Sequence, residues 1–194
     1  MERKITIGSV LSNGIQLGIK NAASLLGCII LWILTFWIPY INVGTTIAMA
    51  CIPLEMAKGN IISPLAIFDK KYFKYLGEFF LIYSFMQMGI MVGVIFLIIP
   101  GIVIAIAWSL GILLMIDKGL NPMEALTASN KATTGYKWTI FLSHLAVGVV
   151  VYIAAYIFGL IPTIGWLLVI AVSIVAWAAI LGMQAYIYSK LSEE

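Results

Sequence analysis

Three long uncharged stretches limit what this chain can fold into. Residues 21–54, 79–116 and 138–189 contain no Asp, Glu, Lys or Arg, and they run for 34, 38 and 52 residues. One helix crosses the hydrocarbon core of a bilayer in about 20 residues, whereas 38 residues of straight helix would extend about 57 Å through a core of about 30 Å. Each stretch must therefore fold back on itself.

The composition assigns the chain to the membrane class. Of its 194 residues, 63% are hydrophobic and only 10% are charged. A soluble domain of this length needs a polar surface that these proportions cannot supply. The first twenty residues contain no continuous apolar stretch of the kind that a removable signal peptide carries, so we expect an integral membrane protein that begins near Met1.

Each uncharged stretch has an Ile-Pro dipeptide near its middle, with the prolines at Pro39, Pro100 and Pro162. Proline removes a backbone donor and disfavours helix in the residue before it, and Gly101 can take the positive-φ position of a tight turn. The alternative is a proline kink in one long helix. The length of the stretches favours a hairpin tip at each proline.

The prolines are 61 and 62 residues apart, which indicates three copies of one unit. The units cover about 1–58, 59–118 and 119–194 of a single membrane domain, and each has an amphipathic segment before its hairpin. In the third copy, Asn121, Pro122 and Glu124 form a helix-start signal. We predict an all-α polytopic membrane protein with six transmembrane helices, arranged as three repeated helical hairpins with cytoplasmic amphipathic helices.

The charges indicate the orientation of these helices. All eleven Lys and Arg lie at the termini and in the two connections between units, and none lies near a proline turn. Basic residues stay on the cytoplasmic side. We therefore predict a multi-pass protein of the bacterial cytoplasmic (inner) membrane, with both termini and both connections inside and the three turns outside. The amphipathic segments are either ordinary connectors or contacts for lipids and partners.

The stretch from Ile98 to Phe141 resembles the membrane domain of some glycerophosphodiester phosphodiesterases and of related six-span bacterial proteins of the YciC type. The resemblance is carried, in the family's order and spacing, by Pro100-Gly101, Asp117, Gly119, Pro122, Ala125-Leu126, Ser129, Thr133, Gly135 and Trp138. Asn130 departs from the family, in which an aromatic residue is usual, and no catalytic domain follows the last span. The resemblance implies a six-span fold and leaves activity open.

Few polar side chains lie inside the predicted spans. His144 is a candidate proton relay or ligand, although such a histidine can equally hydrogen-bond a neighbouring helix. Gln87 and Gln184 are either interhelical hydrogen-bond partners or the lining of a small polar cavity. The sequences Gly14-x-x-x-Gly18 and Gly89-x-x-x-Gly93 predict close helix packing.

The residues needed for catalysis are missing. Hydrolysis of a phosphodiester normally needs grouped carboxylates with histidines or a metal cluster, and the chain has one histidine. Cys28 and Cys51 are interpreted as inert packing thiols. We therefore predict no enzyme activity, no cofactor and no metal. With a net charge of only +3, the chain has no basic patch large enough to bind nucleic acid.

Two functional hypotheses follow. The preferred one is a non-enzymatic membrane module that contacts membrane lipids, or organises a membrane-protein partner or further copies of itself. Its working surface would be a cytoplasmic face formed by Asp117, Glu124, Ser129, Thr133 and Trp138. The alternative is an oligomeric channel or transporter for small solutes, which requires His144, Gln87 and Gln184 to converge on one cavity. An enzyme that acts on lipid headgroups is the least favoured.

Overall fold

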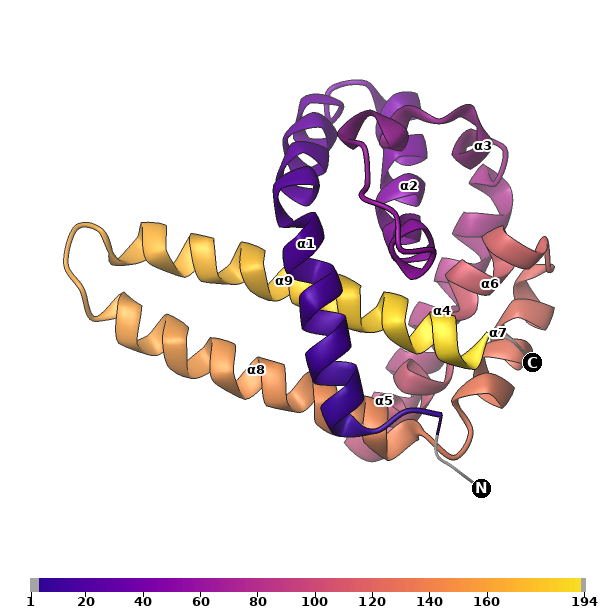
Figure 1. Cartoon of the computed structure of the whole chain (residues 1–194). Helices are drawn as coiled ribbons and strands as arrows, with labels where there is room; N and C mark the ends of the chain where they lie inside the picture. The colour runs from indigo at the N-terminus through magenta and orange to yellow at the C-terminus, as the bar shows by residue number, and fades with distance from the viewer. Residues whose placement is uncertain (1–3, 193–194) are drawn as a thin grey trace.

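The structure is a computed structural model that describes residues 4–192, and its regular elements are all helical (Figure 1). This confirms the predicted all-α class. The elements are α1 (Ile7–Leu34), α2 (Pro39–Ala57), η1 (Pro64–Phe68), α3 (Lys70–Phe73), α4 (Leu76–Phe96), α5 (Ile98–Ala107), α6 (Gly111–Lys118), α7 (Pro122–Thr133), α8 (Lys137–Gly159) and α9 (Gly165–Leu191).

Five segments are long and apolar enough to cross a membrane: α1, α4, the α5–α6 pair, α8 and α9. The sequence predicts six spans, and the missing one is α2. Helix α2 carries Asn42, Thr45, Thr46 and Glu55, which lower its hydropathy, and nine of its residues are buried in the protein. Its buried residues make α2 part of the protein core.

The first and last helices make the most extensive contact in the fold. Helix α1 crosses α9 where three glycines meet: a Cβ on Gly182 would lie 2.1 Å from the Gly14 oxygen, and a Cβ on Gly18 would lie 2.3 Å from the Ala178 oxygen. The backbones can approach this closely because none of the three glycines carries a side chain. The predicted packing role of Gly14-x-x-x-Gly18 is therefore confirmed.

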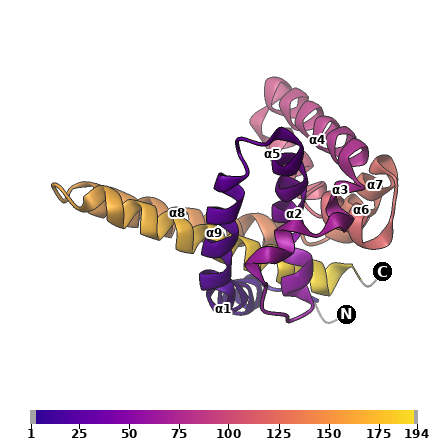
Figure 2. The same cartoon turned by 90° about the horizontal axis from the view of Figure 1, so that it is seen from above.

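The helix pairs that flank the three prolines, α1–α2, α4–α5 and α8–α9, point in different directions. Helices α8 and α9 project together as an arm, and α1 runs across them in both views (Figures 1 and 2). Pro39 is the first residue of α2, Pro100 lies in the first turn of α5, and Pro162 lies in the loop between α8 and α9. A chain reversal therefore occurs at or beside each proline.

The prediction for Gly101 is wrong. The chain turns at Leu97, which is extended, and Gly101 is helical in α5. The residue is needed for packing, because a Cβ on Gly93 of α4 would lie only 2.8 Å from the Gly101 Cα atom. The pair lets α4 and α5 pack tightly at the tip of their hairpin.

The segments before the hairpins differ from one another. The first is fused with the first span, since α1 runs without interruption from Ile7 to Leu34. The second is broken at Asp69, whose extended backbone separates η1 from α3. Only the third is a separate helix of some length, and its predicted start is confirmed: Asn121 and Glu124 cap α7 reciprocally, at 2.9 and 3.2 Å.

The connection between the first and second units packs along α2. The Phe73 ring lies against Gly44, and the rings of Tyr40 and Phe73 are 5.5 Å apart. Tyr40 also shares a pocket with Lys70 and Lys74. The sequence predicts that the Pro39 turn and this basic connection lie on opposite sides of the membrane. The shared pocket contradicts this prediction, because it places Tyr40, next to Pro39, beside Lys70 and Lys74.

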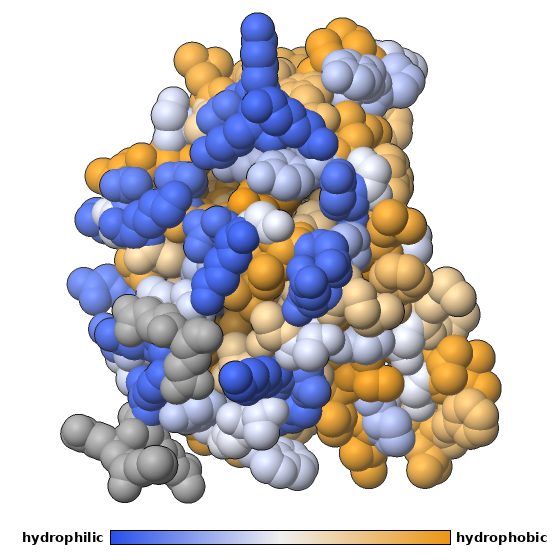
Figure 3. All heavy atoms as spheres, turned by 90° about the vertical axis from the view of Figure 1, so that its right-hand side faces the viewer, coloured by the Kyte–Doolittle hydropathy of each residue, from blue (hydrophilic) through white to orange (hydrophobic). Residues whose placement is uncertain are grey.

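The hydrophilic side chains gather on the side of the molecule where α3, α6 and α7 lie, opposite the α8–α9 arm (Figure 3). Both ends of the described chain are fastened near this side. The Lys4 amide donates to the Tyr136 hydroxyl at 3.3 Å, and the Lys118 ammonium donates to the Ser192 backbone oxygen. The rest of the surface is rich in exposed apolar side chains.

Candidate functional site

One of the candidate membrane spans is broken by a turn. Helix α5 ends at Ala107 and α6 begins at Gly111, so Trp108, Ser109 and Leu110 form an irregular turn within one predicted span. Some backbone groups in such a turn lose their helical partners, and in an apolar environment they need replacements. We call this turn, from Ala107 to Gly111, the α5–α6 joint.

Helix α7 supplies the first of these partners. The Ser129 hydroxyl donates to the Ala107 oxygen at 2.7 Å and accepts from the Leu110 amide at 3.1 Å. Thr133, one turn later, donates to the Ser129 oxygen at 2.9 Å and approaches the Ala107 oxygen at 3.4 Å. Both side chains are completely buried.

Helix α9 supplies a further partner. The Gln184 side-chain amide donates to the Ser109 oxygen at 2.9 Å, across 75 residues of sequence. Three side chains from two helices thus bind the backbone of the joint. Because these backbone groups are satisfied, the joint is a structural connection and not an open ligand site.

The predicted cytoplasmic face is divided by the structure. Ser129 and Thr133 are buried against the joint, so their assignment to an exposed working surface is wrong. Asp117, Glu124 and Trp138 are exposed. The Asp117 carboxylate accepts a hydrogen bond of 2.6 Å from the Tyr188 hydroxyl, which ties the end of α6 to the end of α9.

The candidate intramembrane residues do not share a hydrogen-bond network. Nδ1 of His144 lies 2.8 Å from the Ile140 oxygen of its own helix. Gln87 is exposed on α4 and hydrogen-bonds to none of residues 4–192. Gln184 is engaged at the joint. Each of the three thus has a separate environment.

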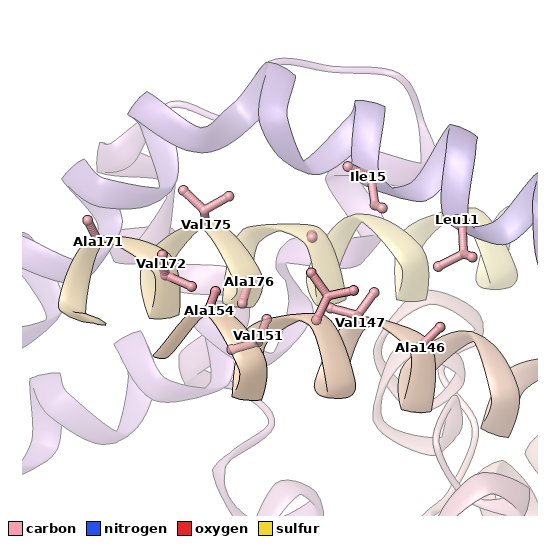
Figure 4. A pocket seen from close by; sticks show the side chains of 12 residues that line it. Leu11, Ile15, Ala146, Val147, Val151, Ala154, Ala171, Val172, Val175 and Ala176 are labelled. Atoms are coloured by element: carbon pink, nitrogen blue, oxygen red, sulfur yellow. The ribbon is translucent and has the colours of Figure 1, made fainter. Parts of the chain in front are cut away.

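Two further grooves lie on the surface of the α8–α9 arm and beside α5. One, of about 500 Å³, lies where α1 crosses the α8–α9 arm, and Figure 4 shows its short aliphatic side chains directed into the space between the three helices. Its lining includes Leu11 and Ile15 of α1, Val147 and Val151 of α8, and Val172 of α9.

A second groove combines apolar and basic character, and we call it the α5–α8 notch. It has a volume of about 380 Å³ and lies between α5 and the first turns of α8. Its lining consists of Ile99, Ile102, Val103, Ile106, Thr134, Gly135, Lys137, Trp138 and Phe141.

Three charged side chains form a small network at the basic connection. Glu55 lies 3.3 Å from the Lys58 ammonium and 3.4 Å from that of Lys71. Burial raises the pKa of Glu55, but the two ammonium groups together outweigh it, so the net shift is downward. The hydrogen bond from the Lys71 amide, at 3.0 Å, lowers the pKa of Asp69. These groups stabilise the connection on α2.

The part of the chain that the structure describes contains no cluster of metal-ligating side chains. Within residues 4–192, no three side chains of His, Cys, Asp or Glu come together. The two thiols, Cys28 and Cys51, are free and buried.

The sequence reasoning missed the α5–α6 joint. The available signals were Ser109 inside an apolar stretch and the pair Ser129 and Thr133, four residues apart on the apolar face of α7. Four-residue spacing places two side chains on one face of a helix. A polar pair on a buried face needs buried partners, and a broken span is one source of them.

The chain matches no protein-family model, no curated protein and no solved structure. The resemblance of Ile98–Phe141 to the phosphodiesterase-associated membrane domain therefore stays a prediction.

Proposed function

We propose that the chain is a non-enzymatic membrane module of the bacterial cytoplasmic membrane that contacts lipids and organises partners. The observation that carries this proposal is the use of the intramembrane polar groups. Gln184, Ser129 and Thr133 stabilise the α5–α6 joint, His144 lies against its own helix, and Gln87 is exposed. A transport site needs such groups to face a common cavity, whereas a module needs only that each is accommodated locally.

The distribution of surface types supports the same proposal. The groove between α1 and the α8–α9 arm is lined by aliphatic side chains, which suit acyl chains, and the hydrophilic side carries the exposed ends of α6 and α7 (Figure 3). The working surface in this proposal is the exposed part of Asp117–Trp138, which includes Glu124 and Trp138.

We place both termini on the cytoplasmic side. Lys4 and Ser192 are both fastened near the hydrophilic side, by Tyr136 and Lys118, and Lys131 of α7 lines a pocket with Lys118 and Ser192. Basic residues favour the cytoplasmic side.

Solute flux tests this proposal against transport. The full-length protein is reconstituted into liposomes, and release of a panel of small ions and solutes is compared for the wild type, a His144→Ala/Gln87→Ala variant and empty liposomes. We expect all three to release solute at the same rate. Flux above that of empty liposomes would overturn the proposal, and its loss in the double variant would identify the transport site.

Photocrosslinking tests the positive part of the proposal. A photoreactive residue at Met123 or Trp138, which are 59% and 75% exposed, should give lipid or protein adducts in cells. The same residue at Ser129, which is fully buried, should give only intramolecular products. Equal yields of external adducts from the exposed and the buried positions would contradict the assignment of this surface.

A further inference from the structure

The α5–α8 notch changes in character from one end to the other. Thr133 lies against Ala107, so the notch residues Thr134, Gly135 and Lys137 follow directly from the C-terminal end of α5. The apolar lining extends from there along α5 to Ile99, a distance of about 10 Å for seven helical residues. One end therefore offers a cation, and the other offers only hydrocarbon.

We propose that this notch binds one anionic phospholipid, with the phosphate at Lys137 and an acyl chain along α5. The inference rests on the proposed lipid-contacting function and names the lipid class and the site.

The polar end fits an anionic headgroup. The Lys137 ammonium donates one hydrogen bond, at 2.9 Å, to the Asn130 side-chain oxygen, which positions it and leaves two donors for a phosphate. The residues that line the notch include no carboxylate, so the local charge is positive. Trp138 lies beside Lys137, is 75% exposed and packs edge-on against Phe141, with the ring centroids 5.9 Å apart. Exposed tryptophan side chains are typical of the headgroup level of a membrane.

The apolar end fits an acyl chain. Ile99 and Val103 are 72% and 41% exposed, and Ile102 and Ile106 complete the same wall of α5. Helices α5 and α8 make only limited contact with each other, so a wedge remains between them. An acyl chain in the wedge gains dispersion contacts that neither helix supplies to the other.

Native mass spectrometry of the full-length protein in detergent tests the site. The protein is titrated with phosphatidylglycerol or phosphatidylcholine of identical chains, and the dissociation constant of the first lipid is measured. We expect phosphatidylglycerol to bind about fivefold more tightly, which is the contribution of one interfacial lysine. Lys137→Gln should abolish this preference, and Lys137→Arg should retain it.

Matched variants separate the site from general effects. Lys20→Gln removes the same charge from an exposed position on α1 and should leave the preference intact. Val103→Trp fills the notch and should weaken binding of both lipids, whereas Ile95→Trp, at a 75% exposed position of α4, should not. Inorganic phosphate added at millimolar concentration should not displace the lipid.

Several results would overturn the inference. These are equal binding of the two lipids by the wild type, equal effects of Lys137→Gln and Lys20→Gln, no effect of Val103→Trp, and displacement by inorganic phosphate. Any of them would leave the broader proposal of a lipid-contacting module standing, because that proposal depends on the absence of flux and on the photocrosslinked adducts.

Discussion

The side-chain amide of Gln184 donates a 2.9 Å hydrogen bond to the backbone oxygen of Ser109, joining α9 to the break between α5 and α6. Together with Ser129, it gives the α5–α6 joint partners from two directions. The joint therefore determines how α7 and α9 pack against α5 and α6.

Replacing Gln184 with leucine should destabilise the protein by about 1 kcal/mol, because the Ser109 oxygen loses its partner in an apolar environment. The free energy of unfolding in mixed micelles measures the effect. Gln87→Leu is the matched control: Gln87 is exposed on α4, so the same change there should leave stability equal or higher. Equal losses in the two variants would refute the structural role of Gln184.

Ser129→Ala should cost about 1–3 kcal/mol of unfolding free energy, since it leaves the Leu110 amide without its acceptor and the Ala107 oxygen with only the longer bond from Thr133. Thr127→Ala, two residues earlier on the exposed side of α7, should change stability by less than about 0.5 kcal/mol. Hydrogen exchange of the Leu110 amide gives a second readout, and unchanged protection in the Ser129 variant would contradict the assigned contact.

Gly182→Ala should cost about 1–3 kcal/mol, because the new methyl group meets the α1 backbone, which cannot move away as a flexible side chain could. Gly148→Ala on α8 is the control, since no atom lies within 4 Å of its added Cβ and alanine favours helix. Gly182→Ala should therefore lower the melting temperature, whereas Gly148→Ala should leave it unchanged or raise it. A tolerated Gly182→Ala would mean that α1 and α9 do not cross at this point.

Stability should fall in acid partly through Asp69, which caps α3. Its pKa is lowered in the folded protein, so its stabilising effect is complete above the unfolded pKa of about 3.9 and is lost as the pH falls through the lower folded pKa. Asp69→Asn keeps a good capping group without the charge. The melting temperature of the wild type should exceed that of the variant at pH 7, and the gap should close as the pH falls below about 4. A gap that is constant over this range would exclude the charge as the cause.

Membrane-impermeant maleimide should label Trp37→Cys from the same side as Lys74→Cys, since Tyr40 shares its pocket with Lys70 and Lys74. Leu160→Cys, at the tip of the α8–α9 arm, should be labelled from the opposite side. The native cysteines are buried and supply little background. If Trp37→Cys and Leu160→Cys were labelled from the same side of the membrane, the topology that the charge pattern predicts would be supported instead.

The helical class, the chain reversals at the three prolines and the start of α7 could all be predicted because each depends on local chemistry. Uncharged length and the Asn121–Glu124 capping box carry that information within a few residues. The break at Trp108–Leu110 could not be predicted in this way, because its hydrogen-bond partners lie 19 to 75 residues away.

The candidate site shows the same limit. The sequence places Ser129 and Thr133 on a cytoplasmic working face, because a short helix with charged neighbours resembles an interfacial one. The structure turns their face toward the joint, and the exposed positions that remain are Asp117, Glu124 and Trp138. The α5–α8 notch combines residues from two units and has no signature in either unit alone.

The crossing of α1 and α9 at Gly14, Gly18 and Gly182 has a consequence for biosynthesis. The first helix leaves the ribosome more than 130 residues before its main packing partner has been made. During that interval the glycine face of α1 lacks the helix that it packs against in the folded protein. The contact between α1 and α9 can therefore form only after the helices between them have been synthesised.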